Sequence, residues 1–190
     1  MSLTEWGELH EEAGGELVRG RLQEEEVADP VHELAVTWLV FAIRGWLGGR
    51  GYVFGSELKL AIDEQHGRKP DLSVFLRARA LPRRGPVRVA PDIAVEVVTP
   101  TPADERRDRV DKMSEYARFG ILYYWLLDPA LGSLEIFELD ERQRYARVFV
   151  ATRGSHDAIP GCQGLTLDLD ALWDELARLE PDERDQRDPA

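Results

Sequence analysis

Three charged residues in the middle of the chain have the types and order of a metal-dependent hydrolytic site: Asp71, Glu96 and Lys112. Carboxylates supply the hard oxygen ligands that Mg²⁺ and Mn²⁺ prefer, and a nearby cation can orient water or neutralise charge that develops on a phosphate. The backbone carbonyl of Val97, next to Glu96, is a natural further ligand. The set predicts phosphodiester hydrolysis in which Asp71, Glu96 and Val97 hold the metal and Lys112 assists the attacking water.

Strand signals surround both acids. The segments KPDLSVFL (residues 69–76) and PDIAVEVV (residues 91–98) are β-rich and mostly apolar, and Pro70 suits the beginning of a strand. Glu96 needs an explanation there, because a buried carboxylate costs several kcal/mol unless it is paired or metal-bound. An ion pair with Lys112 alone would also satisfy it.

The segment after Glu96 predicts a helix that carries Lys112. Thr101 can cap it, Pro102 fits its first position, Asp104 lies near the positive end of its dipole, and Gly120 can end it. A helix that follows a strand folds back over its sheet, so Lys112 can reach toward the strand ends. Helical spacing places Val110, Met113 and Ala117 on one apolar stripe. The flank beside that stripe carries Asp108, Lys112 and Tyr116, which are four residues apart.

The remaining patterns predict an α/β (α+β) fold with a mixed central β-sheet flanked by helices. Pro30 opens a long apolar-periodic helix that Gly48 and Gly49 can end. The other predicted elements are strands over residues 16–23, 51–54, 57–62, 121–127, 134–139 and 145–151 and a short helix over residues 170–179.

Length and composition favour a single compact domain over residues 1–180, followed by an acidic, disordered tail over residues 181–190. Cys162 stands alone, so no internal disulfide forms, and the four histidines are too scattered for a zinc site. The longest nearly apolar run, residues 34–43, is too short to span a membrane, and the amino terminus lacks a basic-then-apolar leader. We therefore expect a soluble, cytoplasmic protein.

The formal charge of −12 is unusual for an enzyme that binds nucleic acid, because phosphate binding draws on basic surface. The acids concentrate at the two ends of the chain. Asp71, by contrast, lies within a basic segment that contains Arg68, Lys69, Arg77, Arg79, Arg83, Arg84 and Arg88. The arginines of residues 77–88 could form a solvated loop, and their nearness to Asp71 in the sequence suggests phosphate contacts.

Several of these segments together resemble the Uma-type putative restriction endonucleases, a bacterial branch of the PD-(D/E)XK nuclease superfamily. The similarity rests on GELVRGRL, on KPDLSVFL, and on PDIAVEVVTPTPADERRDRVDKMSEYARFGILYYWLLDP, in the order that the family shows. It implies a restriction-endonuclease-like core and a metal-dependent endonuclease that acts on DNA.

The resemblance also assigns roles. Asp71 would be the acid of the first motif, Glu96 the acid of the second, and Lys112 the lysine that has moved from strand to helix. The superfamily's usual E-x-K would place lysine at position 98, where this chain has Val98. The resemblance further implies that His32 or Glu33 of the first long helix approaches the site, and Glu33 is taken as the additional catalytic candidate.

Two other functions fit the sequence. A catalytically silent interaction module could keep the fold and the acidic cluster, and a hydrolase of small phosphodiesters would not need a wide basic groove. The tripeptide Glu57-Leu58-Lys59 is a literal E-x-K, but it precedes the Pro-Asp element in a predicted outer strand and is interpreted as a decoy. Asp92 is interpreted as structural or as a secondary ligand. Cutting both strands often uses two sites, which favours a homodimer, although no heptad pattern supports one.

Overall fold

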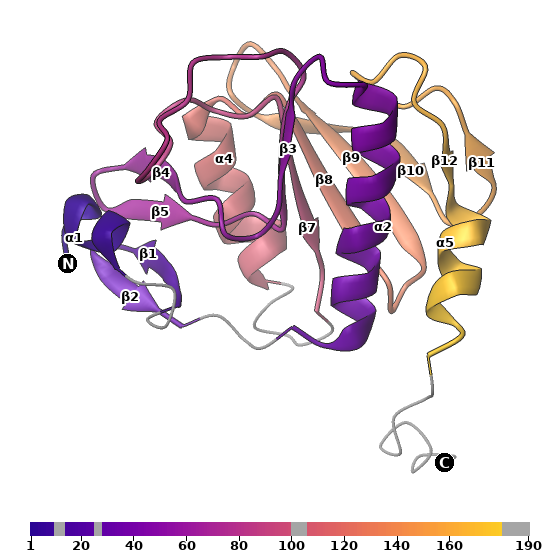
Figure 1. The fold of residues 1–190 in the computed structure, drawn as a ribbon, viewed down its shortest axis with the longest axis horizontal. Helices are drawn as coiled ribbons and strands as arrows, with labels where there is room; N and C mark the ends of the chain where they lie inside the picture. The colour runs from indigo at the N-terminus through magenta and orange to yellow at the C-terminus, as the bar shows by residue number, and fades with distance from the viewer. Residues whose placement is uncertain (10–13, 25–27, 100–105, 180–190) are drawn as a thin grey trace.

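A mixed six-stranded sheet forms the centre of the protein, as the computed structural model describes it for residues 1–9, 14–24, 28–99 and 106–179 (Figure 1). The strand order is β10-β9-β8-β7-β6-β3, and β7 and β8 run parallel while the other neighbouring pairs are antiparallel. The strands are β3 (Tyr52–Phe54), β6 (Leu72–Phe75), β7 (Ile93–Val97), β8 (Tyr123–Asp128), β9 (Ser133–Leu139) and β10 (Tyr145–Ala151). The predicted mixed sheet flanked by helices is confirmed.

The two faces of this sheet pack against different elements. Residues Ile93, Val95 and Val97 of β7 share a buried cluster with α2 (Pro30–Leu47) and α5 (Leu169–Leu176). Ala94 of β7 instead shares a cluster with Tyr116 of α4 (Met113–Phe119). Because side chains alternate along a strand, Glu96 faces the same side as Ala94, toward α4.

Helix α2 begins and ends as its sequence predicts. The Asp29 carboxylate accepts a hydrogen bond from His32 N at 2.8 Å, Pro30 occupies the first turn, and Gly48 closes the helix at φ 56°. His32 and Glu33 therefore lie in the first turn, at the end of α2 that is lowest in Figure 1.

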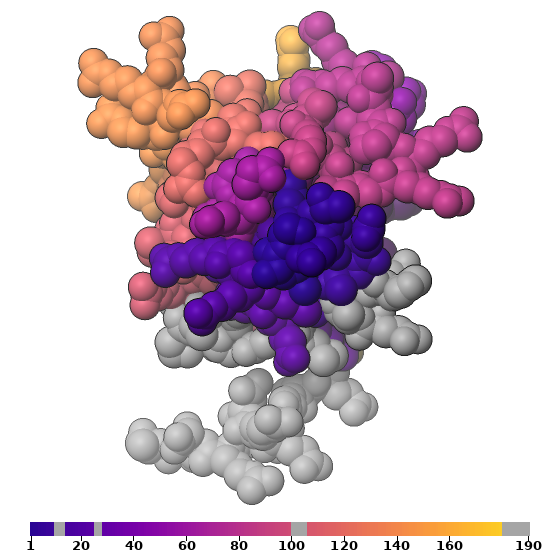
Figure 2. Space-filling view, turned by 90° about the vertical axis from the view of Figure 1, so that its left-hand side faces the viewer, coloured from indigo at the N-terminus to yellow at the C-terminus, as the bar shows by residue number. Residues whose placement is uncertain are grey.

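A second, four-stranded antiparallel sheet lies beside the helix α4 face, in the order β2-β1-β5-β4. Its strands are β1 (Glu16–Val18), β2 (Arg21–Gln23), β4 (Leu60–Asp63) and β5 (His66–Arg68). Helix α1 (Leu3–Glu8), which the sequence did not predict, packs Trp6 against Leu17 and Ala61 of this sheet. Figure 2 shows this indigo N-terminal segment on the surface of that face. A small pair, β11 (Ser155–His156) and β12 (Leu167–Asp168), precedes α5.

Three predicted strands differ in their bounds. Residues 16–23 form the β1–β2 hairpin, because Arg19 and Gly20 turn the chain at φ 52° and 72°. Residues 57–59 precede β4 rather than belong to it. Residues 69–71 connect β5 of the small sheet to β6 of the central sheet, so Asp71 lies just before β6.

The helix that carries Lys112 is wider than predicted over its described first part. Residues Arg107–Lys112 form a π-helical turn, η1, which continues into α4. The wider turn changes which side chains face inward, so Val110 is 56% exposed and the predicted apolar stripe is wrong at that position. Gly120 ends the helix as predicted, at φ 89°. The predicted start at Thr101–Asp104 and the predicted tail lie outside the described residues.

Within the part of the chain that the structure describes, no helix has the length and apolar character that crossing a membrane requires.

The pairing of β3 with β6 predicts a sharp difference between two glycines. A Cβ at Gly51 would collide with the Phe75 carbonyl oxygen and lie 2.8 Å from Leu76 C, whereas a Cβ at Gly45, inside α2, meets nothing within 4 Å. Urea unfolding should show Gly51→Ala to be destabilised by about 2–3 kcal/mol. Gly45→Ala should be stabilised by about 0.5–1 kcal/mol, through helix propensity. Equal effects of the two substitutions would contradict the register.

Candidate active site

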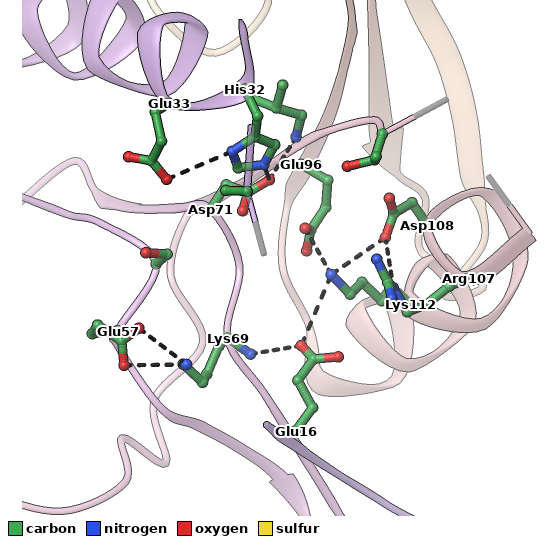
Figure 3. Close-up of a pocket in the computed structure, with 14 residues that line it drawn as sticks. Glu16, His32, Glu33, Glu57, Lys69, Asp71, Glu96, Arg107, Asp108 and Lys112 are labelled. Atoms are coloured by element: carbon green, nitrogen blue, oxygen red, sulfur yellow. Dashed lines mark hydrogen bonds and ion pairs between the residues drawn. The ribbon is translucent and has the colours of Figure 1, made fainter. Parts of the chain in front are cut away.

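A cavity of about 240 Å³ opens where the first turn of α2, the end of β7 and η1 meet (Figure 3). The residues that line it come from segments far apart in the chain. The residues predicted to hold the metal or to act in catalysis are among them: His32, Glu33, Asp71, Glu96, Val97 and Lys112. The fold therefore brings the predicted constellation together at one place.

The Lys112 ammonium lies among three carboxylates. Its Nζ is 2.7 Å from Glu96 Oε2, 3.3 Å from Asp108 Oδ1 and 3.8 Å from Glu16 Oε1. Lys112 is only 5% exposed. Burial alone would lower the pKa of Lys112, but the surrounding carboxylates outweigh it and raise that pKa, so the side chain stays charged.

Glu96 is held at both oxygens. Lys112 contacts Oε2, and Tyr116 OH donates to Oε1 at 2.6 Å. Burial raises the pKa of Glu96 well above its usual range. Lys112 opposes this effect, while the carboxylates of Asp71, Asp108 and Glu16 reinforce it. Burial and the neighbouring carboxylates thus disfavour the charged form of Glu96 despite its contact with Lys112.

Asp71 is fixed beside the end of β7. Its Oδ2 accepts a hydrogen bond from Val97 N at 2.7 Å and lies 3.2 Å from His32 Nε2. Burial lowers the pKa of His32, but the hydrogen bond and charge of Asp71 outweigh it and leave that pKa raised. Among the described residues, no hydrogen bond engages Asp71 Oδ1. Of the two predicted first-helix residues, His32 contacts Asp71, while Glu33 lines the cavity with a side chain 64% exposed.

The sequence reasoning missed a layer of charges behind Lys112. Glu16 of β1 accepts from Arg68 Nη1 at 2.6 Å and from Lys69 N at 2.9 Å. Arg68 in turn binds both oxygens of Glu115, at 2.6 and 3.0 Å. Burial raises the pKa of Glu16, but Lys112 and Arg68 outweigh it and lower that pKa overall. One signal was available: Glu16 is the second residue of GELVRGRL, a segment that carries the family resemblance.

The expected phosphate-binding arginines lie elsewhere. Arg68 is 1% exposed and occupied by the two glutamates. The loop after β6 begins beside the far end of α2, where Ala78 N donates to Arg50 O, and an 18-residue helix is about 27 Å long. Arg77 and Arg79 therefore lie far from Asp71, although they are close to it in the sequence.

Asp92 has a structural role at that same far end. Its Oδ2 accepts from Leu76 N at 2.8 Å and its Oδ1 pairs with Arg79. Asp92 lies four positions before Glu96 in the chain, and along an extended strand this corresponds to roughly 13 Å. It is not a secondary ligand at this cavity.

The side chains at the cavity could supply some, but not all, of the ligands that a magnesium ion needs. Across residues 1–9, 14–24, 28–99 and 106–179, no three His, Cys, Asp or Glu side chains form a ready-made metal cluster. Two carboxylates, Asp71 and Glu96, do line one cavity together with Val97. Magnesium is commonly held by one or two carboxylates while water and substrate phosphates complete its shell, so this set suits such an ion.

A comparison with protein families places this chain in one family. The family described as Uma2, putative restriction endonuclease, matches residues 4–170. The chain belongs to the Uma2 family. The matched region includes all of the residues that line the cavity, from Glu16 to Lys112.

Similarity to a solved structure supports the fold. A crystal structure of a putative nuclease belonging to DUF820, from Anabaena variabilis ATCC 29413, superposes with a TM-score of 0.72 at 20% identity. The alignment covers 93% of this chain and 99% of that one. No curated protein matches the sequence.

The raised pKa of Glu96 predicts how stability changes with pH. Between the unfolded-state pKa, about 4.5, and the higher folded-state pKa, the native protein binds more protons at Glu96 than the unfolded chain does. Ionisation of Glu96 therefore lowers the free energy of unfolding as pH rises, and Glu96→Gln removes that effect. Urea unfolding from pH 5 to 8 should show the stability of Glu96→Gln rising relative to wild type. A constant difference across that range would contradict the assignment.

Proposed function

We propose that this protein is a Mg²⁺- or Mn²⁺-dependent endonuclease that hydrolyses phosphodiester bonds of DNA. The observation that carries the proposal is the contact of Lys112 with Glu96 in a cavity that Asp71 also lines. Two acids and a lysine at one cavity are the groups that metal-assisted phosphodiester hydrolysis needs. Membership of a family described as restriction endonucleases supports DNA as the substrate.

The metal ligands in this proposal are the carboxylates of Asp71 and Glu96 and the backbone carbonyl of Val97. The hydrogen bond from Val97 N to Asp71 Oδ2 holds this peptide beside the first carboxylate. A bound divalent ion would supply Lewis acidity at the scissile phosphate and lower the pKa of a water molecule. Tyr116 OH fixes the orientation of the Glu96 carboxylate through its 2.6 Å hydrogen bond.

Lys112 acts as a fixed positive charge rather than as a base. Its pKa is raised by the surrounding carboxylates, so it carries no free electron pair near neutral pH. Its remaining N–H donors can orient the attacking water or stabilise negative charge on a phosphate oxygen. In the reaction, the water oxygen bonds to phosphorus and gives up a proton to solvent, the bond from phosphorus to the leaving oxygen breaks, and that oxygen takes up a proton from solvent.

His32 positions Asp71 from the opposite side. The 3.2 Å contact of its Nε2 with Asp71 Oδ2 fixes which carboxylate oxygen remains available toward the cavity. Glu33, on the same helical turn, adds negative charge at the exposed rim and is a weaker participant in this proposal.

Substitution of the core residues should abolish cleavage in variants that circular dichroism shows to be folded. Plasmid nicking with Mg²⁺ or Mn²⁺ should fall by about 100-fold or more for Glu96→Gln and for Lys112→Met, since each removes a group that acts on the reacting phosphate. Glu141→Gln, an exposed position in the β9–β10 turn, serves as the matched control and should keep wild-type activity.

Each outcome separates the competing functions. Nicking by wild type and by Glu141→Gln, but not by the two core variants, supports the endonuclease. Cleavage of a small phosphodiester such as bis-p-nitrophenyl phosphate without nicking would favour the small-substrate hydrolase. No hydrolysis of either substrate with either metal would favour the silent interaction module.

A further inference from the structure

A second lysine lines the cavity on a different side from Lys112. Lys69 lies between β5 and β6, with a side chain only 4% exposed. Its backbone N–H is held by Glu16 at 2.9 Å, and Figure 3 shows its side chain directed toward Glu57 and away from Lys112. The fold therefore buries a second ammonium beside the proposed reaction centre.

The Lys69 ammonium faces both carboxylate oxygens of Glu57, as it would face two oxygens of a phosphate group. Lys69 Nζ lies 3.1 Å from Glu57 Oε1 and also 3.1 Å from Oε2, so the carboxylate presents both oxygens at once. The two partners differ in burial, because the Glu57 side chain is 67% exposed. Glu57 belongs to the literal E-x-K tripeptide, which precedes β4 instead of forming part of it.

The lysine of that tripeptide, Lys59, binds other partners than Lys69 does. Lys59 Nζ donates to the backbone oxygens of Trp6 and Leu9, at 2.9 and 3.1 Å. Burial lowers the pKa of Lys59, and the neighbouring Lys69 ammonium lowers it further, while Glu57 opposes both effects. Two ammonium groups thus influence each other, and the exposed Glu57 carboxylate acts on both.

We propose that Lys69 forms a phosphate-binding subsite for the DNA backbone and that Glu57 occupies this subsite until a phosphate of the substrate displaces it. The inference rests on the proposed function for its ligand. An exposed carboxylate gains little from a single ion pair, because water solvates it well when it leaves. A backbone phosphate offers the same paired oxygens and remains tethered to the strand that the reaction centre binds. The sequence feature first interpreted as a decoy then has a role in substrate binding rather than in catalysis.

Removing the competing carboxylate should strengthen DNA binding. The probe is a fluorescently labelled DNA oligonucleotide, titrated by anisotropy with EDTA present so that cleavage does not interfere. Glu57→Gln should bind about 3- to 5-fold more tightly than wild type. The matched control is Glu64→Gln, which makes the same change in net charge at an exposed glutamate paired with Arg88, outside the cavity lining. This control should change affinity by less than about 1.5-fold.

The double variant Lys69→Met/Glu57→Gln tests the partner directly. It should bind no more tightly than Lys69→Met alone, and Lys69→Met should lower the slope of log K against log salt by about 1. Equal effects of Glu57→Gln and Glu64→Gln, or absence of DNA binding in every variant, would overturn the subsite. Plasmid nicking on the same proteins judges the proposed function separately, since binding that follows the expected pattern without any nicking would refute only the endonuclease.

Discussion

A buried ammonium surrounded by carboxylates is the interaction on which the described site depends. Lys112 is charged and nearly inaccessible, and it contacts Glu96 of the central sheet, Asp108 of its own π-helical turn and Glu16 of the small sheet. Removal of one partner from such a group leaves an uncompensated buried charge, which costs about 3–5 kcal/mol. The contacts therefore hold three separate elements in the geometry that the proposed chemistry uses.

The small sheet belongs to this charge network as much as the central sheet does. Glu16 joins Lys112 to Arg68, and Arg68 continues to Glu115 on α4, which lies 3.9 Å from His66 of β5. The network thus runs from the proposed reaction centre to β1 and β5, the two inner strands of the small sheet. It explains how residues from the first and the middle thirds of the sequence meet at one cavity, although no single motif contains them.

The central acids and the lysine were predictable because the patterns that point to them lie within neighbouring segments of the sequence. An acid inside an apolar strand needs a partner, strand alternation fixes its face, and the following helix must cross that face. Glu16 was not predictable in this way, since its contact with Lys112 depends on how two sheets pack. A search for 3.6-residue periodicity cannot detect a π-helical turn, and for this reason Val110 was predicted to lie on the buried face although it is exposed. The arginines after β6 are close to Asp71 in sequence, but a strand and the length of α2 separate their loop from the site.

The central claim is that Asp71 and Glu96 hold a divalent metal ion, and calorimetric titration of Mn²⁺ tests it most directly. Wild-type protein and a variant that replaces Asp71 with asparagine would be titrated at pH 7.5. Asparagine keeps the size of the side chain and one acceptor oxygen for Val97 N, so a folded variant isolates the loss of charge. The account predicts saturable binding to wild type and at least about 10-fold weaker binding to the variant. Equal affinity of the two proteins, or no binding by wild type, would contradict it.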